Sequence, residues 1–148
     1  MADRPMTLMP AGLDPPVPFE QCFDANYGLE IVGEDVAGAG FVASRVAVRD
    51  DLLDHRGAVP VGLFATIAEA IASRGTALAV MPGGRMAMGL SNDTTATAEL
   101  RSGAVLSEAR VQARGDDAWV WSVQHRDDSG RVCAFSRITV AVRRMTSA

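Results

Sequence analysis

The longest helical pattern in the chain is residues 60–81, which read PVGLFATIAEAIASRGTALAVM. Large apolar side chains recur there at three- and four-residue spacings and predict one buried helical face. They are Leu63, Phe64, Ile67 and Ile71. Pro60 suits the first turn of a helix, and the run Pro82-Gly83-Gly84 ends it. Gly75 and Thr76 weaken the prediction for its second half.

Glu69 is the single charged residue between Gly57 and Arg74, and 3.6 residues per turn place it opposite the large apolar side chains. The side chains predicted on its own face are all small: Gly62, Ala65, Thr66, Ala72, Ser73 and Thr76. Two interpretations stay open with equal weight: a solvated stripe, or a narrow face that admits a ligand or another subunit. In the second, Glu69 is partly desolvated and more basic, and Ser73 bonds to it or to a water.

Strand patterns surround this helix. They cover residues 29–32, 41–48, 86–97, 104–114, 118–126 and 132–143, and an acidic, glycine-rich turn is expected at 33–40. Within residues 104–114, four side chains are predicted to point inward: Val105, Ala109, Val111 and Ala113. One long central helix wrapped by a curved, mostly antiparallel sheet of five to six strands is an α+β domain.

The 148 residues suit one domain, 18–145, preceded by an irregular, proline-rich arm at 1–17. All 14 basic residues are Arg, which excludes a lysine Schiff-base enzyme. The spacing of Cys22, His55, His125 and Cys133 matches no zinc motif, so no metal site is expected. A net charge of −4 argues against a nucleic-acid partner. We expect no signal peptide, no membrane span and a cytoplasmic location.

Several segments together resemble the hotdog-fold acyl-CoA thioesterases, most closely the phenylacetate-pathway (PaaI-like) and 4-hydroxybenzoyl-CoA thioesterase group. Residues 52–57 and 59–69 resemble the polar loop, the Gly-x-Val-His-Gly-Gly turn and the apolar run to an acidic residue. Residues 69–73 resemble the helix that carries this residue, and 89–103, 103–115 and 128–134 resemble the strands and hairpins that follow. The resemblance covers roughly residues 19–142. It implies a hotdog fold in a homodimer or a dimer-of-dimers homotetramer.

The resemblance also implies an activity: hydrolysis of an acyl-CoA thioester to the free acid and coenzyme A, with no cofactor. By the same resemblance, Glu69 is the nucleophile or general base, and the backbone N–H of Val61 is the oxyanion donor. Ser73 helps to place a water or the carboxylate, and Asp54 falls where the family has an amide side chain. The sites form across a dimer interface, with the carboxylate from one subunit and the oxyanion hole from the other.

The chain departs from the family pattern at the turn before the helix, where His-Gly-Gly is replaced by Pro60-Val61-Gly62. The branched side chain of Val61 crowds a bound carbonyl, and an ionised Asp54 cannot donate a hydrogen bond. His55 either supplies the missing donor or is an ordinary exposed loop residue. Further substrate-binding candidates are Pro60, Gly62, Asn92 and Thr94, with Arg101, Arg114 and Arg126 as candidates for the coenzyme A phosphates.

Two other functions remain open at this stage. The altered turn also fits a non-catalytic hotdog domain that binds an acyl-CoA or a protein. A hotdog hydratase or dehydratase ranks last, because it needs a histidine paired with a carboxylate near the central helix, and neither His55 nor His125 lies in that helix. Trp119 and Trp121 line an acyl tunnel or, as we favour, pack in the core or a dimer interface.

Overall fold

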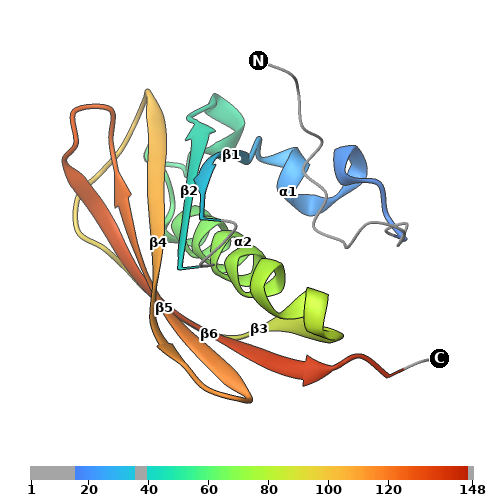
Figure 1. Cartoon of the computed structure of the whole chain (residues 1–148). Coiled ribbons are helices and arrows are strands. Elements are labelled where there is room, and N and C mark those ends of the chain that lie inside the picture. Colours follow the sequence, from blue (N-terminus) through green and yellow to red (C-terminus); the bar gives the residue numbers. More distant parts are fainter. Residues whose placement is uncertain (1–15, 36–39, 147–148) are drawn as a thin grey trace.

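The computed structural model describes residues 16–35 and 40–146. Its six-stranded sheet curves around one long helix (Figure 1). Two short helical segments, a 3₁₀ turn at Phe19–Gln21 and α1 at Phe23–Asn26, precede the strands β1 (Glu30–Glu34) and β2 (Phe41–Ala47). The central helix α2 (Val61–Val80) lies between 3₁₀ turns at Asp50–Leu52 and Met81–Gly83. Strands β3 (Arg85–Ala96), β4 (Ala104–Arg114), β5 (Ala118–Arg126) and β6 (Val132–Arg144) complete the chain.

The strand order is β1-β2-β4-β5-β6-β3, and every neighbouring pair is antiparallel. This confirms the predicted hotdog architecture of one helix in a curved antiparallel sheet. Strands β1 and β3 form the two edges of the sheet. The predicted turn at 33–40 begins too early, because Gly33 and Glu34 continue β1 after a bulge and pair with β2. The predicted arm at 1–17 lies outside the described residues, apart from Pro16 and Val17.

The apolar face of α2 packs into the concave side of the sheet, as the spacing predicted. Leu63, Phe64, Ile67 and Ile71 are all buried. Trp119, Trp121 and Val123 of β5 are buried in the same core, which confirms the packing role favoured for the two tryptophans. By length and composition the segment Val61–Gly83 is apolar enough to cross a membrane, but 56% of its most apolar window is buried inside this protein. Its apolar character therefore matches its role as the core helix.

The second half of α2 is helical despite Gly75 and Thr76, because Trp121 packs there. A Cβ atom on Gly75 would lie 2.4 Å from the Trp121 ring, so only glycine allows this approach. The indole N–H of Trp121 donates to Thr76 Oγ1 at 2.9 Å, and the Thr76 hydroxyl donates to the Ala72 carbonyl at 3.0 Å. Tertiary packing therefore outweighs the weak helix propensity of these two residues.

Two predictions of side-chain direction are wrong. Ala72 and Thr76 were predicted on the small face around Glu69, but both are fully buried, and the hydroxyl of Thr76 accepts the indole N–H of Trp121. Ala113 was predicted to point inward and is exposed. A bulge between Val111 and Ala113 shifts the register of β4 against β5, and a shift of one residue moves a side chain to the other face of a sheet.

Candidate active site

Glu69 lies on the exposed side of α2, against the edge strand β3. A Cβ atom on Gly89 of β3 would lie only 2.5 Å from Glu69 Oε1, so the absence of a side chain at Gly89 makes room for the carboxylate. The hydroxyl of Ser73, one helical turn later, donates to Oε1 at 2.6 Å. The two residues are therefore joined as the sequence predicted. Glu69 is exposed in the single chain, so one chain alone does not supply the expected desolvation.

An open cavity of about 460 Å³ lies beside Glu69. It brings together five of the predicted site residues, namely Val61, Gly62, Glu69, Asn92 and Thr94, and its other lining residues are Phe23, Ala65 and Thr66. The helical lining residues follow one face of the first half of α2, while Asn92 and Thr94 come from β3. The narrow face of small side chains thus faces a space wide enough for a ligand.

The N-terminus of α2 opens into this cavity. Val61 is the first helical residue, and Pro60 precedes it with extended backbone. The first N–H groups of a helix have no partner within the helix, and they carry the positive end of the helix dipole. Pro60 itself accepts a hydrogen bond from the N–H of Leu63 at 3.0 Å. The side chain of Val61 is 48% exposed at the cavity mouth, so a branched apolar group stands beside the predicted oxyanion donor.

Asp54 organises the turn that leads into α2. Its carboxylate accepts hydrogen bonds from the backbone N–H groups of Arg56 at 2.8 Å and Ala58 at 3.2 Å. The Arg56 guanidinium, 2.8 Å from Oδ2, holds the pKa of Asp54 down at about 2. The neighbouring His55 is exposed. Neither Asp54 nor His55 lines the cavity of the single chain, and their catalytic roles stay predictions.

Two of the arginines proposed for the coenzyme A phosphates, Arg101 and Arg114, lie at opposite ends of β4. Arg101 precedes β4 and donates to the Arg56 carbonyl at 2.6 Å and to Glu99 at 2.8 Å. Arg114 ends β4, with its guanidinium 4.9 Å from the Trp119 ring centre. A strand of this length spans roughly 30 Å, so these two side chains of one chain cannot hold the same phosphate group. Arg126, at the end of β5, donates to the Gly130 carbonyl at 2.9 Å.

Sequence reasoning missed Phe23 as a residue of the site. Phe23 is 66% exposed and lines the cavity, and its ring meets the buried Tyr27 ring edge to face at 5.5 Å. The Tyr27 hydroxyl donates to Asp24 at 2.7 Å, and burial raises the pKa of Tyr27. Pro18 suits the first turn of a short helix, and apolar residues follow it. Nothing local shows that it packs near the start of α2.

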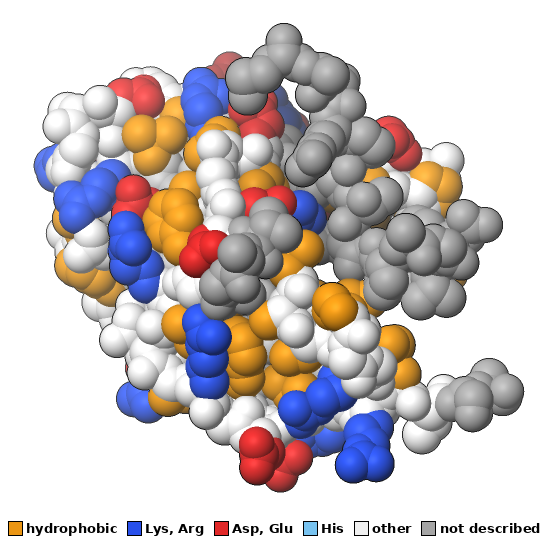
Figure 2. All heavy atoms as spheres, viewed as in Figure 1, with side chains coloured by type: hydrophobic (Ala, Val, Ile, Leu, Met, Phe, Trp, Pro, Cys, Tyr) orange, Lys and Arg blue, Asp and Glu red, His pale blue; other side chains and the backbone are white. Residues whose placement is uncertain are grey.

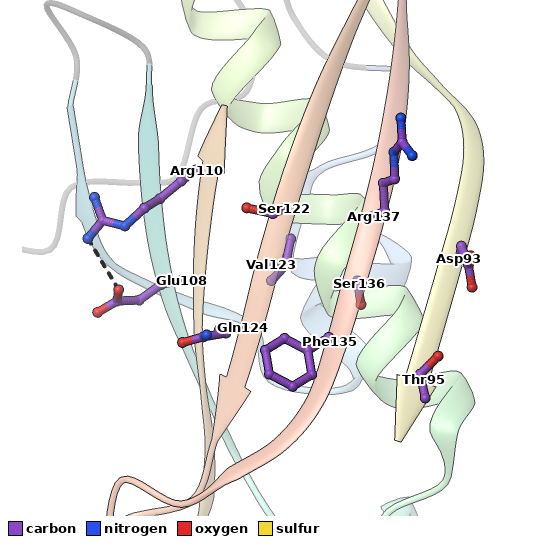
Figure 3. A pocket seen from close by; sticks show the side chains of 10 residues that line it. All are labelled: Asp93, Thr95, Glu108, Arg110, Ser122, Val123, Gln124, Phe135, Ser136 and Arg137. Carbon is purple, nitrogen blue, oxygen red and sulfur yellow. Dashed lines mark hydrogen bonds and ion pairs between the residues drawn. The ribbon is translucent and has the colours of Figure 1, made fainter. Parts of the chain in front are cut away.

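A second hollow, of about 580 Å³, lies on the outer face of the sheet, where the strands turn away from α2 (Figure 3). Arg110 and Glu108 of β4 form an ion pair at 3.4 Å there, and Arg137 and Asp93 are paired in register on β6 and β3. The hollow contains no residue predicted for the site. Its charges balance, so the cavity beside Glu69 is the better candidate active site.

Within the described ranges, no three His, Cys, Asp or Glu side chains gather closely enough to hold a metal ion. His125 is fully buried in the core, with its ring 5.2 Å from the Phe64 ring. Burial lowers the pKa of His125 to about 4, so the imidazole is neutral at pH 7. The hydrogen bonds of its ring go to Ser107 and Ser136 and not to Glu69. A hydratase would require a histidine paired with a carboxylate near the central helix.

Comparisons with known proteins bear on the family and the fold. No family model matches the chain. The chain is 31% identical over 140 residues to "Putative esterase Rv1847" of Mycobacterium tuberculosis, covering 91% of this chain and 93% of that protein. A match of 32% identity to "Putative esterase" of Deinococcus radiodurans spans 81 residues, 55% of this chain and about half (51%) of that protein.

Solved structures show the same fold. The structure of the mycobacterial esterase superposes with a TM-score of 0.78 at 26% identity, covering 84% of this chain and 98% of that one. A mutant of thioesterase PA1618 from Pseudomonas aeruginosa superposes with a TM-score of 0.77 at 23% identity, covering 82% and 86% of the two chains.

Proposed function

The chain belongs to the hotdog-fold family of esterases and thioesterases that includes the mycobacterial Rv1847, and we propose that it hydrolyses an acyl-CoA thioester to the free acid and coenzyme A. One observation carries the proposal: the single carboxylate on the exposed face of α2 lines a cavity wide enough for a ligand, and every copy of the chain also carries free N–H groups at the start of α2. A carboxylate and a set of free N–H groups are the two parts that acyl transfer needs.

Glu69 is the reacting group in this proposal. Its Oε1 is held by the Ser73 hydroxyl, which leaves Oε2 to attack the thioester carbonyl or to take a proton from a water that attacks it. Collapse of the tetrahedral intermediate breaks the C–S bond and releases coenzyme A as a thiolate. Where Oε2 is the nucleophile, this step leaves a mixed anhydride on Glu69, and a water then hydrolyses it to the free acid and restores the carboxylate. The thiolate leaves with little help from an acid, because thiols are far more acidic than alcohols. The proposal requires no metal or redox cofactor. It includes the cytoplasmic location that the sequence predicts.

The Val61 N–H is the proposed donor to the oxyanion, and it comes from a second copy of the chain. Eight residues separate Val61 from Glu69 in α2, which is about 12 Å along the helix axis. The carboxylate attacks the carbonyl carbon from about 3 Å, and the carbonyl oxygen lies about 3 Å from its N–H donor. A bound carbonyl therefore spans only roughly half of the distance between Val61 and Glu69 of one helix. A second copy with its own Pro60–Gly62 turn beside Glu69 removes this mismatch.

Strand β3 is the proposed surface for that second copy. It is an edge strand of twelve residues whose ladder is formed with β6. Met86, Met88 and Leu90 are 38%, 47% and 63% exposed along it, and Figure 2 shows apolar side chains at the surface of the molecule among the charged ones. The unpaired backbone groups of an exposed, apolar edge strand are a template for pairing with another chain. Pairing of β3 with β3 places both Glu69 cavities at one interface, in a homodimer or a dimer of dimers.

One observation favours a second candidate, a domain that binds acyl-CoA without turnover. The Val61 side chain stands half-exposed where a thioester carbonyl must approach the N–H. Tight binding of an acyl-CoA that yields no free thiol and persists in Glu69→Gln would identify this function.

The test is thiol release from a panel of aryl- and fatty-acyl-CoA substrates, comparing the wild type with Glu69→Gln. We expect at least one substrate to be hydrolysed and its kcat to fall about a thousandfold in the variant, since Gln cannot act as a base or nucleophile. An unchanged melting temperature of the variant controls for folding. Equal thiol release by the two proteins with every substrate would refute the catalytic role.

A further inference from the structure

A chain of hydrogen bonds leads from the core of the sheet towards the cavity beside Glu69. At its buried end, Ser107 Oγ lies 2.7 Å from Nδ1 of His125, and Nε2 of His125 lies 3.0 Å from Ser136 Oγ. Ser136 Oγ in turn lies 2.7 Å from Thr94 Oγ1. Ser107, His125 and Ser136 are all buried, whereas Thr94 lines the cavity. The imidazole is therefore connected to the cavity wall through two hydroxyl groups.

The chain ends on the helix that carries Glu69. Thr94 Oγ1 donates to Asn92 Oδ1 at 2.7 Å, and Asn92 Nδ2 donates to the Ala65 carbonyl at 2.8 Å. Ala65 lies one turn before Glu69, and its carbonyl is the helical acceptor for the N–H of Glu69. Asn92 thus connects β3 to α2 at the turn that fixes the position of Glu69.

Proton counting sets the direction of this chain, starting at Ala65. A carbonyl only accepts, so Asn92 must turn its NH₂ group to the helix and its Oδ1 to Thr94. The single hydroxyl proton of Thr94 is then used on Asn92. Ser136 must therefore donate to Thr94, because two oxygens 2.7 Å apart with no proton between them repel each other.

The same count continues into the core. The hydroxyl proton of Ser136 is used on Thr94, so Nε2 of His125 must donate to Ser136. A neutral imidazole carries one proton, which leaves Nδ1 as the acceptor for the Ser107 hydroxyl. A single tautomer of His125, protonated at Nε2, thus satisfies every bond from Ser107 to Ala65.

We propose that His125 is a positioning residue that acts through Ser136 and Thr94 to hold the Asn92 amide with one N–H on Ala65 and the other directed into the Glu69 cavity. The proposal rests on the hydrolysis proposed above, in which this second N–H donates to the carbonyl oxygen of the acyl thioester. Asn92 and Glu69 line the same cavity, so the donor and the carboxylate meet a common ligand. Asn92 is then a substrate-contacting donor, and His125 contacts no substrate.

The tautomer is tested without any turnover. The full chain is labelled with ¹⁵N-histidine, and the ring nitrogens of His125 are recorded by NMR at pH 7, with His125→Gln used to assign the signals. We expect a protonated Nε2 and an unprotonated Nδ1. Protonation at Nδ1 would overturn the proposal, because Ser136 would then donate to His125 and leave Thr94 without a donor.

The effect on the reaction is tested at Thr94 with a matched pair of variants. Thr94→Val keeps the shape of the side chain and removes the hydroxyl, and we expect kcat to fall about tenfold with an unchanged melting temperature. Thr94→Ser retains the hydroxyl and should restore kcat. An unchanged kcat in Thr94→Val, or a loss that Thr94→Ser does not restore, would overturn the positioning role. A wild type that hydrolyses no substrate refutes the proposed function instead, and the NMR result alone then decides whether the chain runs as inferred.

Discussion

Glu69 accepts a hydrogen bond of 2.6 Å from Ser73, and its side chain packs against Gly89 of the neighbouring strand. These two contacts fix the carboxylate on an otherwise small and uncharged helix face. The sequence predicts both the residue and its serine, because a lone acid among small side chains is visible at helical spacing. The contact with Gly89 is not predictable in that way, since it depends on how β3 crosses α2.

His125 makes stability depend on pH. Burial lowers its pKa from 6.5 to about 4, so between these values the unfolded chain binds a proton that the folded chain does not. The contribution of the neutral His125 to the free energy of unfolding is therefore complete above pH 6.5. It is lost as the pH falls from 6.5 to 4, which lowers the free energy of unfolding by about 3 kcal/mol in total.

Urea unfolding of the wild type, His125→Gln and the exposed-site control His55→Gln from pH 7 to 4.5 measures this loss. We expect His125→Gln to be less stable at pH 7 and to lose less stability on acidification, while His55→Gln follows the wild type. Parallel pH profiles for the wild type and His125→Gln would show that the buried imidazole does not cause the loss.

At the scale of elements, α2 shows how packing overrides local preference. Gly75 and Thr76 weaken the helix by composition alone, yet the helix runs through to Val80 because Trp121 fills the space over Gly75. The bulge near Ala113 and the burial of Thr76 were equally invisible to periodicity. Periodicity therefore predicted which elements form, whereas their exact faces depended on partners distant in sequence.

The same substitution at two positions of α2 should have opposite effects. Gly75→Ala places a methyl group 2.4 Å from the Trp121 ring, and we expect it to destabilise the protein by about 1–3 kcal/mol. Gly62→Ala meets nothing within 4 Å and should stabilise the helix by roughly 0.5–1 kcal/mol. Chemical unfolding of both variants checks this. Stabilisation by both would mean that Trp121 does not pack against Gly75.

At the scale of the whole molecule, the candidate site is an open cavity that one chain does not close. Glu69 is exposed, the first turn of α2 is about 12 Å away along the axis, and the adjacent edge of β3 carries exposed apolar side chains. The resemblance of the sequence to a known family predicts that a second copy of the chain completes this site. The contribution of Phe23 could not be predicted, because it depends on how the short α1 helix packs on the rest of the chain.

Charge on the β3 edge should separate the subunits. In the double variant Met88→Lys with Leu90→Lys, two exposed apolar side chains of β3 become cationic, and we expect the molar mass to fall to that of a monomer and thiol release to be lost. Val32→Lys is the matched control, because Val32 is 59% exposed on the opposite edge strand β1. Light scattering after size-exclusion chromatography measures the molar mass of the double variant and of the control. Equal masses for the double variant and the wild type would contradict the proposed contact through β3.

The central claim is that Glu69 of one copy works with the Val61 N–H of another, and mixed oligomers test it directly. Val61→Pro removes the N–H and replaces the branched side chain by a ring, and the helix should tolerate it, since proline suits the first position of a helix and the extended Pro60 before it. Glu69→Gln and Val61→Pro chains, each inactive alone, are co-expressed with different tags and assayed for thiol release. If sites form across a two-fold interface, half of the dimers are mixed and each holds one intact site, so about a quarter of wild-type activity returns. If both groups came from one chain, no mixed dimer would hold an intact site, and an inactive mixture would contradict the account.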